Sequence, residues 1–215
     1  GRAGYEERYL EGQRSVLGWA AARARESGIR GHTFLYTGST GVYGQDDGSW
    51  VAEDRMEAVP AEPGSRRAVL RGAEARVRAA APEAFRRWFV LRLAGIYGPG
   101  RQFLVERLRG EPDRYGGNPE GFMNLIHRDD AVDAIRAVLR APEGVADTVF
   151  NVSDGHPARR REVVEWVCGR LGVAVPAFDP EGGRGVPSRR VDASRIRDAV
   201  GWETRYTDFR EGMAC

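Results

Sequence analysis

The stretch HTFLYTGSTGVYG, residues 32–44, places hydroxyl side chains directly after an apolar segment. Ser39 and Thr40 are the residues of this stretch whose types could do chemistry. A hydroxyl held at the end of a buried strand can hydrogen-bond a substrate oxygen that gains or loses a proton. The same residue types also occur in turns, where they satisfy local backbone groups. The pattern therefore indicates either a substrate-orienting turn or a purely structural one.

A second group of candidate residues is basic. The segment GSRRAVLRGAEARV contains Arg66, Arg67 and Arg71. Guanidinium groups bind phosphate or carboxylate through paired hydrogen bonds, but their high pKa makes them poor proton donors. For any single one of these three arginines, a position on a solvated basic helix face is at least as good an interpretation. The chain has no lysine, so its 33 basic residues are all arginine, and a mechanism that needs a lysine cannot run on this chain alone.

These side chains must be positioned by alternating helices and strands. Residues 87–93 form a nearly continuous apolar run, as buried parallel strands do. Residues 42–63 carry Gly, Pro and acidic residues and predict a loop. Helices are expected at 5–27, 65–80, 129–140 and 160–171, and further strands at 32–37 and 148–152. The alternation predicts an α/β fold with a mainly parallel sheet.

Composition excludes several classes of protein. Of the 215 residues 41% are hydrophobic and 30% charged, which suits a globular protein with a buried core. The net charge of +2, with interleaved signs, argues against a nucleic-acid binder, and no apolar run approaches the length of a membrane span. The two cysteines favour a reducing cytoplasm. The three histidines lie far apart without ligand spacing, so we expect no metal site.

Three segments, FLYTGSTGVYG, VLRLAGIYGPGRQF (90–103) and NLIHRDDAVDAI (124–135), follow one another along the chain, with FNVSDG and VDASRIRDAVGW after them. Their order and spacing resemble the extended or atypical short-chain dehydrogenase/reductase superfamily, of the NAD-dependent epimerase/dehydratase type. The resemblance implies a partial doubly wound Rossmann-like parallel sheet plus a small α/β C-terminal substrate lobe. Residues 1–100 would be the C-terminal half of an NAD(P)-binding domain. Residues 101–215 would be the substrate-binding lobe, with a sheet strand returning near 148–152.

The resemblance also implies that something is missing. Such proteins begin with a strand, a GxxGxxG turn and a helix that together hold the dinucleotide pyrophosphate. We identify no such unit in the sequence, so we expect an N-terminally truncated fragment that lacks roughly the first four strands. Residues 32–37 would then form an open sheet edge. The implied cofactor is NAD or NADP, whose binding would need the missing N-terminal part.

Site residues follow from the same resemblance. Ser39 would orient the substrate oxygen as a catalytic residue, with Thr40 beside it. The implied cofactor-binding residues are Thr37, Gly38, Ala94, Gly95 and Ile96, and the implied substrate-binding residues are Tyr43, Arg66, Arg101 and Asn124. For Tyr43 a structural role at the strand end is the main alternative. His127 is expected to be a structural hydrogen-bonding residue and not an acid/base catalyst.

The general acid/base of the superfamily is absent. It is a tyrosine in a YxxxK pattern on the following helix, where the lysine lowers the tyrosine pKa. Alignment on Glu74 places Arg66 at the tyrosine position and Leu70 at the lysine position. The ordinary mechanism is therefore not encoded. Atypical members of the superfamily are similar in carrying an arginine-containing helix in place of YxxxK.

Three functional hypotheses remain. The first is an NAD(P)-dependent epimerase, dehydratase or reductase that acts on a nucleotide sugar or a similar polar carbonyl or hydroxyl compound. The second is a nonenzymatic dinucleotide-binding or regulatory protein of the same fold. The third is a fragment without a function of its own. By analogy with the superfamily, a homodimer would form through helices that include residues 5–27 and 65–80.

Overall fold

The fold is described from a computed structural model, which covers residues 10–110, 112–180, 182 and 188–213. Its centre is a parallel three-stranded sheet with the strand order β1-β3-β8, formed by Gly31–Ser39, Phe85–Leu93 and Thr148–Val152. Ser39 pairs with Leu93, and Leu93 pairs with Val152. The carboxyl ends of the three strands are therefore level with one another, and this is the edge where open α/β sheets bind ligands.

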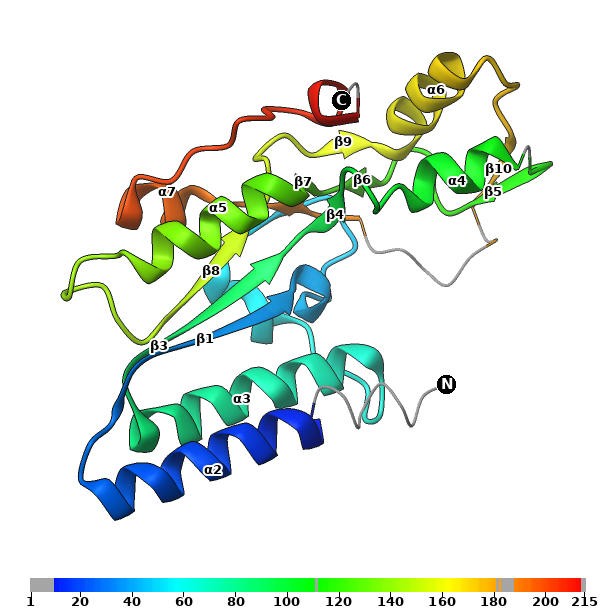
Figure 1. The fold of residues 1–215 in the computed structure, drawn as a ribbon. Helices are drawn as coiled ribbons and strands as arrows, with labels where there is room; N and C mark the ends of the chain where they lie inside the picture. The colour runs from blue at the N-terminus through cyan, green and yellow to red at the C-terminus, as the bar shows by residue number, and fades with distance from the viewer. Residues whose placement is uncertain (1–9, 111, 181, 183–187, 214–215) are drawn as a thin grey trace.

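Helices cover both faces of this sheet, as Figure 1 shows. Helices α2 (Gly12–Ser27) and α3 (Arg66–Ala84) lie together on one face, and α5 (Arg128–Leu139) lies on the other. The sequence sets the helix ends locally. Gly28 ends α2 in the left-handed conformation at a φ of 69°, and the Ser65 side chain caps α3 by accepting from the Ala68 N–H. The fold is thus the expected α/β class, wound on both faces of a parallel sheet.

The hydrophobic core divides along the two faces of the sheet because strand side chains alternate. Trp88 and Val90 of β3 face α2 and α3, where they pack against Leu17 and Val77. The alternate residues of the strands face α5, and this second cluster is built on Phe89, Leu91, Phe150, Val152, Ala134 and Val138. Burial on both faces explains why residues 87–93 read as one continuous apolar run.

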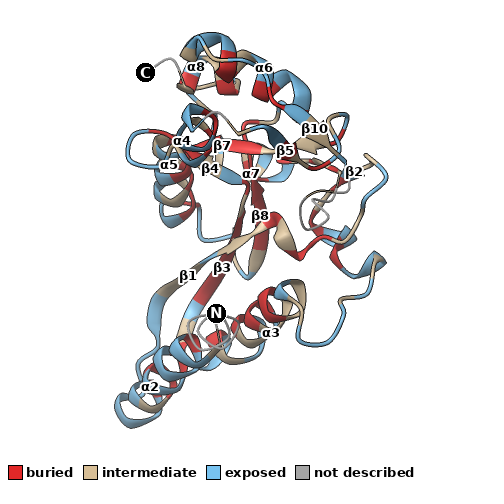
Figure 2. Cartoon of the chain, turned by 90° about the vertical axis from the view of Figure 1, so that its right-hand side faces the viewer, coloured by how far each residue is buried: buried red, intermediate tan, exposed pale blue. Residues whose placement is uncertain are grey.

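The remaining segments build a lobe of short elements beyond the carboxyl end of the sheet. Its short strand pairs are β4–β7 (Gly95–Tyr97 with Leu125–His127), β5–β10 (Arg114–Gly116 with Ala177–Asp179) and β6–β9 (Phe122–Met123 with Ala158–Arg159). The helices of the lobe are α4 (Phe103–Arg109), α6 (Arg160–Leu171) and α8 (Phe209–Met213), whereas α7 (Ser194–Val200) packs through Ile196 into the core of the sheet. Figure 2 shows buried residues in this lobe as well as along the sheet. Leu104, Leu108, Val163, Val167 and Phe209 form its separate core.

The segment at 42–63 is more structured than the loop that its composition predicts. It contains strand β2 (Trp50–Val51) and a 3-10 helix, η3 (Glu53–Ala58). Strand β2 pairs with β11 (Arg190–Val191), which is about 140 residues away along the chain. A two-residue strand leaves no hydrophobic periodicity, so the sequence carries no signal for it.

A buried polar network ties these elements to the sheet. Arg92 of β3 is fully buried and holds the Glu74 carboxylate through Nε (2.9 Å to Oε1) and Nη2 (2.7 Å to Oε2). Its Nη1 donates to the Tyr43 hydroxyl at 2.7 Å and to the Glu53 carbonyl at 2.9 Å. The Tyr43 hydroxyl in turn donates to Asn151 Oδ1 at 2.6 Å. The network therefore joins α3, β3, β8 and the η3 segment in the protein interior.

Tyr43, for which the sequence left a substrate-binding and a structural role open, is part of this network. Its side chain is 1% exposed, and its hydroxyl is occupied as both acceptor and donor. Burial raises the pKa of Tyr43 to about 12, so the phenol stays neutral. These contacts favour the structural role for Tyr43. None of the helices in the described residues is long and apolar enough to cross a membrane.

Candidate functional site

The hydroxyl turn follows β1 at the carboxyl edge of the sheet. Ser39 caps a three-residue 3-10 helix, η2 (Thr40–Val42), and its Oγ accepts from the Gly41 N–H at 3.1 Å. That bond uses the oxygen as an acceptor, so the hydroxyl hydrogen can still be donated to a bound oxygen. Thr40 is buried beside it, which leaves half-buried Ser39 as the better placed of the two predicted catalytic residues.

The glycines of this turn have the spacing of a dinucleotide-binding motif, although the sequence analysis identified no such unit. Gly38, Gly41 and Gly44 match GxxGxxG. The motif works by placing pyrophosphate at the N-terminus of a long helix. Here a 3-10 turn follows, and the chain then runs on to β2. Gly44 has a packing role, since a Cβ at this position would collide with Arg67 Nη1 and with Val59.

Arg189, which the sequence analysis did not single out, lies beside the hydroxyl turn. It precedes β11 and is 8% exposed. Its Nη2 donates to the Thr40 carbonyl at 3.1 Å, and its Nη1 lies 3.4 Å from the Gln45 carbonyl. Asn124 fixes the backbone here, because its Nδ2 donates to the Arg189 carbonyl at 2.9 Å and its Oδ1 accepts from the Val191 N–H at 2.7 Å. Both ends of the Asn124 amide, which the sequence predicted to bind substrate, are thus used in positioning the backbone around Arg189.

The three candidate arginines of α3 have different surroundings. Arg66 lies exposed at the first position of the helix. Arg71 donates to the carbonyls of Val42, Met56 and Val59, and these bonds fix the segment after the turn against α3. Arg67 lies against Gly44, and its Nε is buried without a hydrogen-bond partner. Arg67, the neighbour of the predicted Arg66, therefore lies against the turn with a buried N–H that has no acceptor.

The predicted cofactor residues after β3 lie at the same edge of the sheet. Ala94 donates its N–H to the Val152 carbonyl at 2.9 Å, and Gly95 donates to the Asn124 carbonyl at 2.9 Å. A Cβ at Gly95 would lie 3.1 Å from the Asn124 carbonyl oxygen, so a larger residue would disturb this connection. Gly95 is exposed and Ile96 is half-buried, which leaves the backbone open to close approach by a flat ring. Thr37 is exposed on β1, and Gly38 follows it at the strand end.

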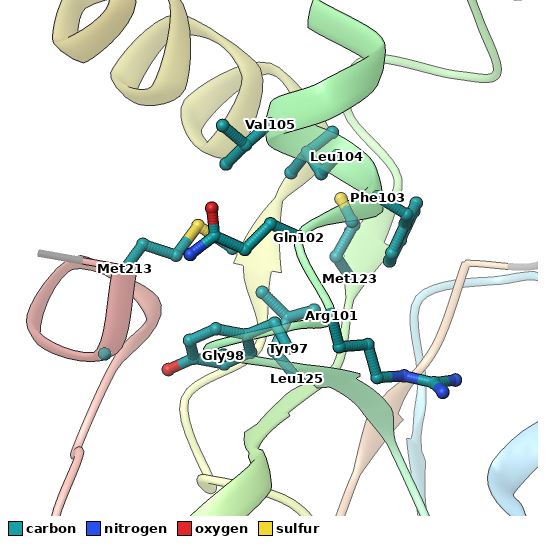
Figure 3. A pocket seen from close by; sticks show the side chains of 11 residues that line it. Tyr97, Gly98, Arg101, Gln102, Phe103, Leu104, Val105, Met123, Leu125 and Met213 are labelled. Carbon is teal, nitrogen blue, oxygen red and sulfur yellow. The ribbon is translucent and has the colours of Figure 1, made fainter. Parts of the chain in front are cut away.

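An apolar pocket of about 400 Å³, open solvent included, lies beside this edge (Figure 3). Its walls come from β4, the start of α4, β6, β7 and α8, and the lining residues include Tyr97, Phe103, Leu104, Met123, Leu125 and Met213. Arg101 stands at its margin, where its guanidinium points away from the apolar side chains and its Nε donates to the Ile96 carbonyl at 3.2 Å. Arg101 thus connects the predicted cofactor segment with the pocket.

His127 has the structural role expected from the sequence. It is buried, and its Nδ1 caps α5 by accepting from the Asp129 N–H at 3.2 Å. Burial lowers the pKa of His127, so the imidazole is neutral near pH 7. Among the residues that the structure describes, no three His, Cys, Asp or Glu side chains come together as ligands for a metal ion.

Asp154 is a second buried ionisable group that sequence reasoning missed. It follows β8 and is 1% exposed. Its Oδ1 accepts from the His156 N–H at 3.0 Å, but its Oδ2 has no hydrogen-bond partner. Burial raises the pKa of Asp154 to about 7. No single-residue signal separates it from the other acidic residues of the sequence, because its burial is a product of tertiary packing.

Comparison with known proteins shows to which family the chain belongs. The model of the NAD dependent epimerase/dehydratase family matches residues 3–153. The chain belongs to this family. The matched stretch contains the hydroxyl turn at Ser39, helix α3 and the glycine-rich loop at 95–100, in this order.

Relatives within the family are similar over part of their length. YeeZ of Escherichia coli strain K12 is 34% identical over 125 residues, which are 55% of this chain and 41% of YeeZ. The dTDP-glucose 4,6-dehydratase of Xanthomonas campestris pv. campestris strain B100 is 30% identical over 122 residues, which are 52% of this chain and 34% of that enzyme. The matched stretch thus spans less than half the length of either relative.

A solved structure shows the same fold. DesIV, a dTDP-glucose 4,6-dehydratase from Streptomyces venezuelae with NAD and TYD bound, matches with a TM-score of 0.81 at 21% identity. The match covers 100% of this chain and 66% of that chain. At this identity the likeness concerns the fold alone. It supports the Rossmann-like architecture expected from the sequence.

Proposed function

We propose that the chain is part of an NAD(P)-dependent epimerase, dehydratase or reductase that acts on a nucleotide sugar or a similar polar carbonyl or hydroxyl compound. The observation that carries the proposal is the Ser39 hydroxyl at the carboxyl edge of a parallel sheet, in a turn whose Thr40 carbonyl accepts from Arg189 and whose last residue, Gly44, lies against Arg67. A hydroxyl donor and guanidinium groups at one edge suit a substrate oxygen that changes its charge during reaction.

The residues around the turn fit a nicotinamide ring. Gly95 is exposed and has no side chain, and the adjacent Ala94 has a small one, so a flat ring could approach the backbone at this edge. Thr37, Gly38 and Ile96 would line the same place. A bound nicotinamide would supply or accept hydride there. DesIV, which shares the fold, was solved with NAD, and this supports a dinucleotide as the cofactor.

Ser39 would hold the substrate oxygen by donating its hydroxyl hydrogen. No tyrosine or lysine occurs on α3, and arginine is a poor proton donor at neutral pH. We therefore assign to Arg67 the electrostatic stabilisation of an oxygen and not proton transfer. The same missing residues favour a second candidate function, a nonenzymatic dinucleotide-binding or regulatory protein of this fold.

Calorimetric titration of NADH and NADPH into the folded chain, followed by an assay of nicotinamide absorbance with dTDP-glucose and UDP-glucose, separates the candidates. Binding with turnover supports the enzyme. Binding without turnover supports the regulatory protein. Absence of dinucleotide binding by a folded chain contradicts both proposals for these 215 residues.

Replacing Ser39 with alanine is expected to leave dinucleotide affinity unchanged and to lower kcat by about 10²–10³, because a donor to the reacting oxygen is lost. The measurement is steady-state turnover together with the calorimetric Kd of NADH. Ser15→Ala is the matched control, since the Ser15 hydroxyl on α2 only donates to the Glu11 carbonyl. Equal turnover in the Ser39→Ala and Ser15→Ala variants would contradict the role of Ser39.

We also propose that two copies associate through α2. Its inner side packs on α3, whereas Val16 and Trp19 are 53% and 68% exposed on the outer side, three residues apart. Trp19→Glu is expected to convert a dimer into a monomer, as measured by light scattering after size-exclusion chromatography. Val132→Glu on α5, another exposed apolar position, should leave the mass unchanged. A wild-type chain that is monomeric at all concentrations would refute this interface.

A further inference from the structure

We propose that Arg67 and Arg189 form a binding site for an oxyanion group of the substrate, a carboxylate or a phosphate, beside the Ser39 turn. The inference rests on the proposed function, because it names the group that the substrate carries close to its reacting oxygen. It implies an acidic substrate whose charge lies next to the carbon that reacts. The two arginines come from distant parts of the chain, the start of α3 and the residue before β11.

Arg189 contributes a buried donor without an acceptor. Only 8% of the residue is exposed, and its two Nη groups are directed to the carbonyls of Thr40 and Gln45. Its Nε is buried and has no hydrogen-bond partner. A buried N–H of a charged group without an acceptor is costly, and a bound oxyanion is one way in which such a group can be satisfied.

Arg67 shows the same pattern beside Gly44, the residue before Gln45. Its Nε is also buried without a partner. Gly44 makes room for its guanidinium, since any Cβ at that position would collide with Nη1. Arg67 lies in the first turn of α3, a helix of 19 residues whose N-terminus carries partial positive charge. The absence of a side chain at residue 44 thus leaves space for the Arg67 guanidinium at the end of the hydroxyl turn.

Neither arginine forms a direct ion pair among the described residues. Burial and the nearby positive charge of Arg67 lower the pKa of Arg189 to about 10. Within the described part of the chain, no carboxylate oxygen lies within 4.0 Å of either guanidinium. The negative charge of Asp46 raises the pKa of Arg189 and so opposes this shift. The Asp46 Oδ1 accepts from the Ser188 N–H at 2.6 Å. Two like charges held together without an anion are unfavourable unless a bound anion compensates them.

In this proposal different side chains hold the anionic group of the substrate and its reacting oxygen. Arg189 donates to the carbonyl of Thr40, the residue after Ser39, and so lies beside the turn that carries the hydroxyl. A guanidinium matches carboxylate and phosphate oxygens with its parallel N–H groups. The substrate would therefore be held at two points, its oxygen by Ser39 and its charge by the arginines.

The test is the binding of simple anions to the chain without any dinucleotide. Inorganic phosphate and malonate are titrated at constant ionic strength, with the melting temperature and the calorimetric Kd as readouts. We expect saturable stabilisation of the wild type and a Kd raised about tenfold or more in both Arg67→Met and Arg189→Met. Tighter phosphate binding would assign a phosphate substrate, and tighter malonate binding a carboxylate substrate.

Control variants distinguish a binding site from a structural role. Arg86→Met removes an exposed charge at the opposite end of β3 and should bind both anions as the wild type does. Without anion, Arg67→Met should melt no lower than the wild type, because an unpaired like charge is removed. A lower melting temperature for Arg67→Met, together with unchanged anion binding in both arginine variants, would overturn the site.

The two proposals can fail separately. Anion binding that depends on Arg67 and Arg189, in a chain that does not bind dinucleotide, would keep the oxyanion site and remove the proposed cofactor. Dinucleotide binding with turnover and no arginine-dependent anion binding would do the reverse.

Discussion

Replacing Arg92 with methionine is expected to lower the free energy of unfolding by about 3–5 kcal/mol. The guanidinium is 0% exposed and is the shared partner of the Glu74 carboxylate, the Tyr43 hydroxyl and the Glu53 carbonyl. Methionine fills a similar space but leaves a buried carboxylate without its counter-ion, and this desolvation cost is the origin of the large effect. Chemical denaturation monitored by circular dichroism gives the difference.

An exposed ion pair supplies the control for Arg92. Arg25 and Glu83 lie 3.3 Å apart with side chains that are 69% and 63% exposed. Arg25→Met removes the same kind of charge, yet it should change the free energy of unfolding by no more than about 1 kcal/mol, because water already solvates both groups. If Arg92→Met and Arg25→Met had equal effects, the buried network would not be a main source of stability.

Asp154→Asn is expected to change how stability depends on pH. The Asp154 carboxyl has a pKa of about 7 in the folded protein, against 3.8 for an ordinary aspartate. Between these values the folded state holds a proton that the unfolded state has lost, so the wild type loses stability as pH rises from about 4 to about 7. The total loss is roughly 4 kcal/mol, and the Asp154→Asn variant would show none of it because an amide does not titrate.

The neighbours of Asp154 agree with the sign of this shift. Burial is its main cause, Asp208 and Asp130 add to it, and the Arg197 charge opposes it. We expect Asp154→Asn to be more stable than the wild type at about pH 8 and similar to it at about pH 4. Denaturation curves across this pH range measure the difference, and Asp198→Asn, an exposed position on α7, is the control. A difference between wild type and Asp154→Asn that does not vary with pH would contradict the buried carboxyl.

The sequence by itself determined the fold class and the family. Apolar runs at 32–37, 87–93 and 148–152 predicted strands that the structure contains as β1, β3 and β8. These features are readable because they are local, since a run of apolar residues and a turn of small ones need no distant partner to be recognised. The family assignment rested on the order of short motifs, and the family model confirmed it.

Tertiary structure decided which side chains surround the hydroxyl turn. The bond from Arg189 to Thr40 joins residues 149 positions apart, and Arg92 reaches Tyr43 across 49. Among 33 basic residues, no local pattern separates these arginines from those on the surface. The ionisation and binding capacity of a charged group depend on its burial and on its neighbours, and both are set by long-range packing. The sequence therefore predicted the position of the turn, and long-range packing determined which arginines lie beside it.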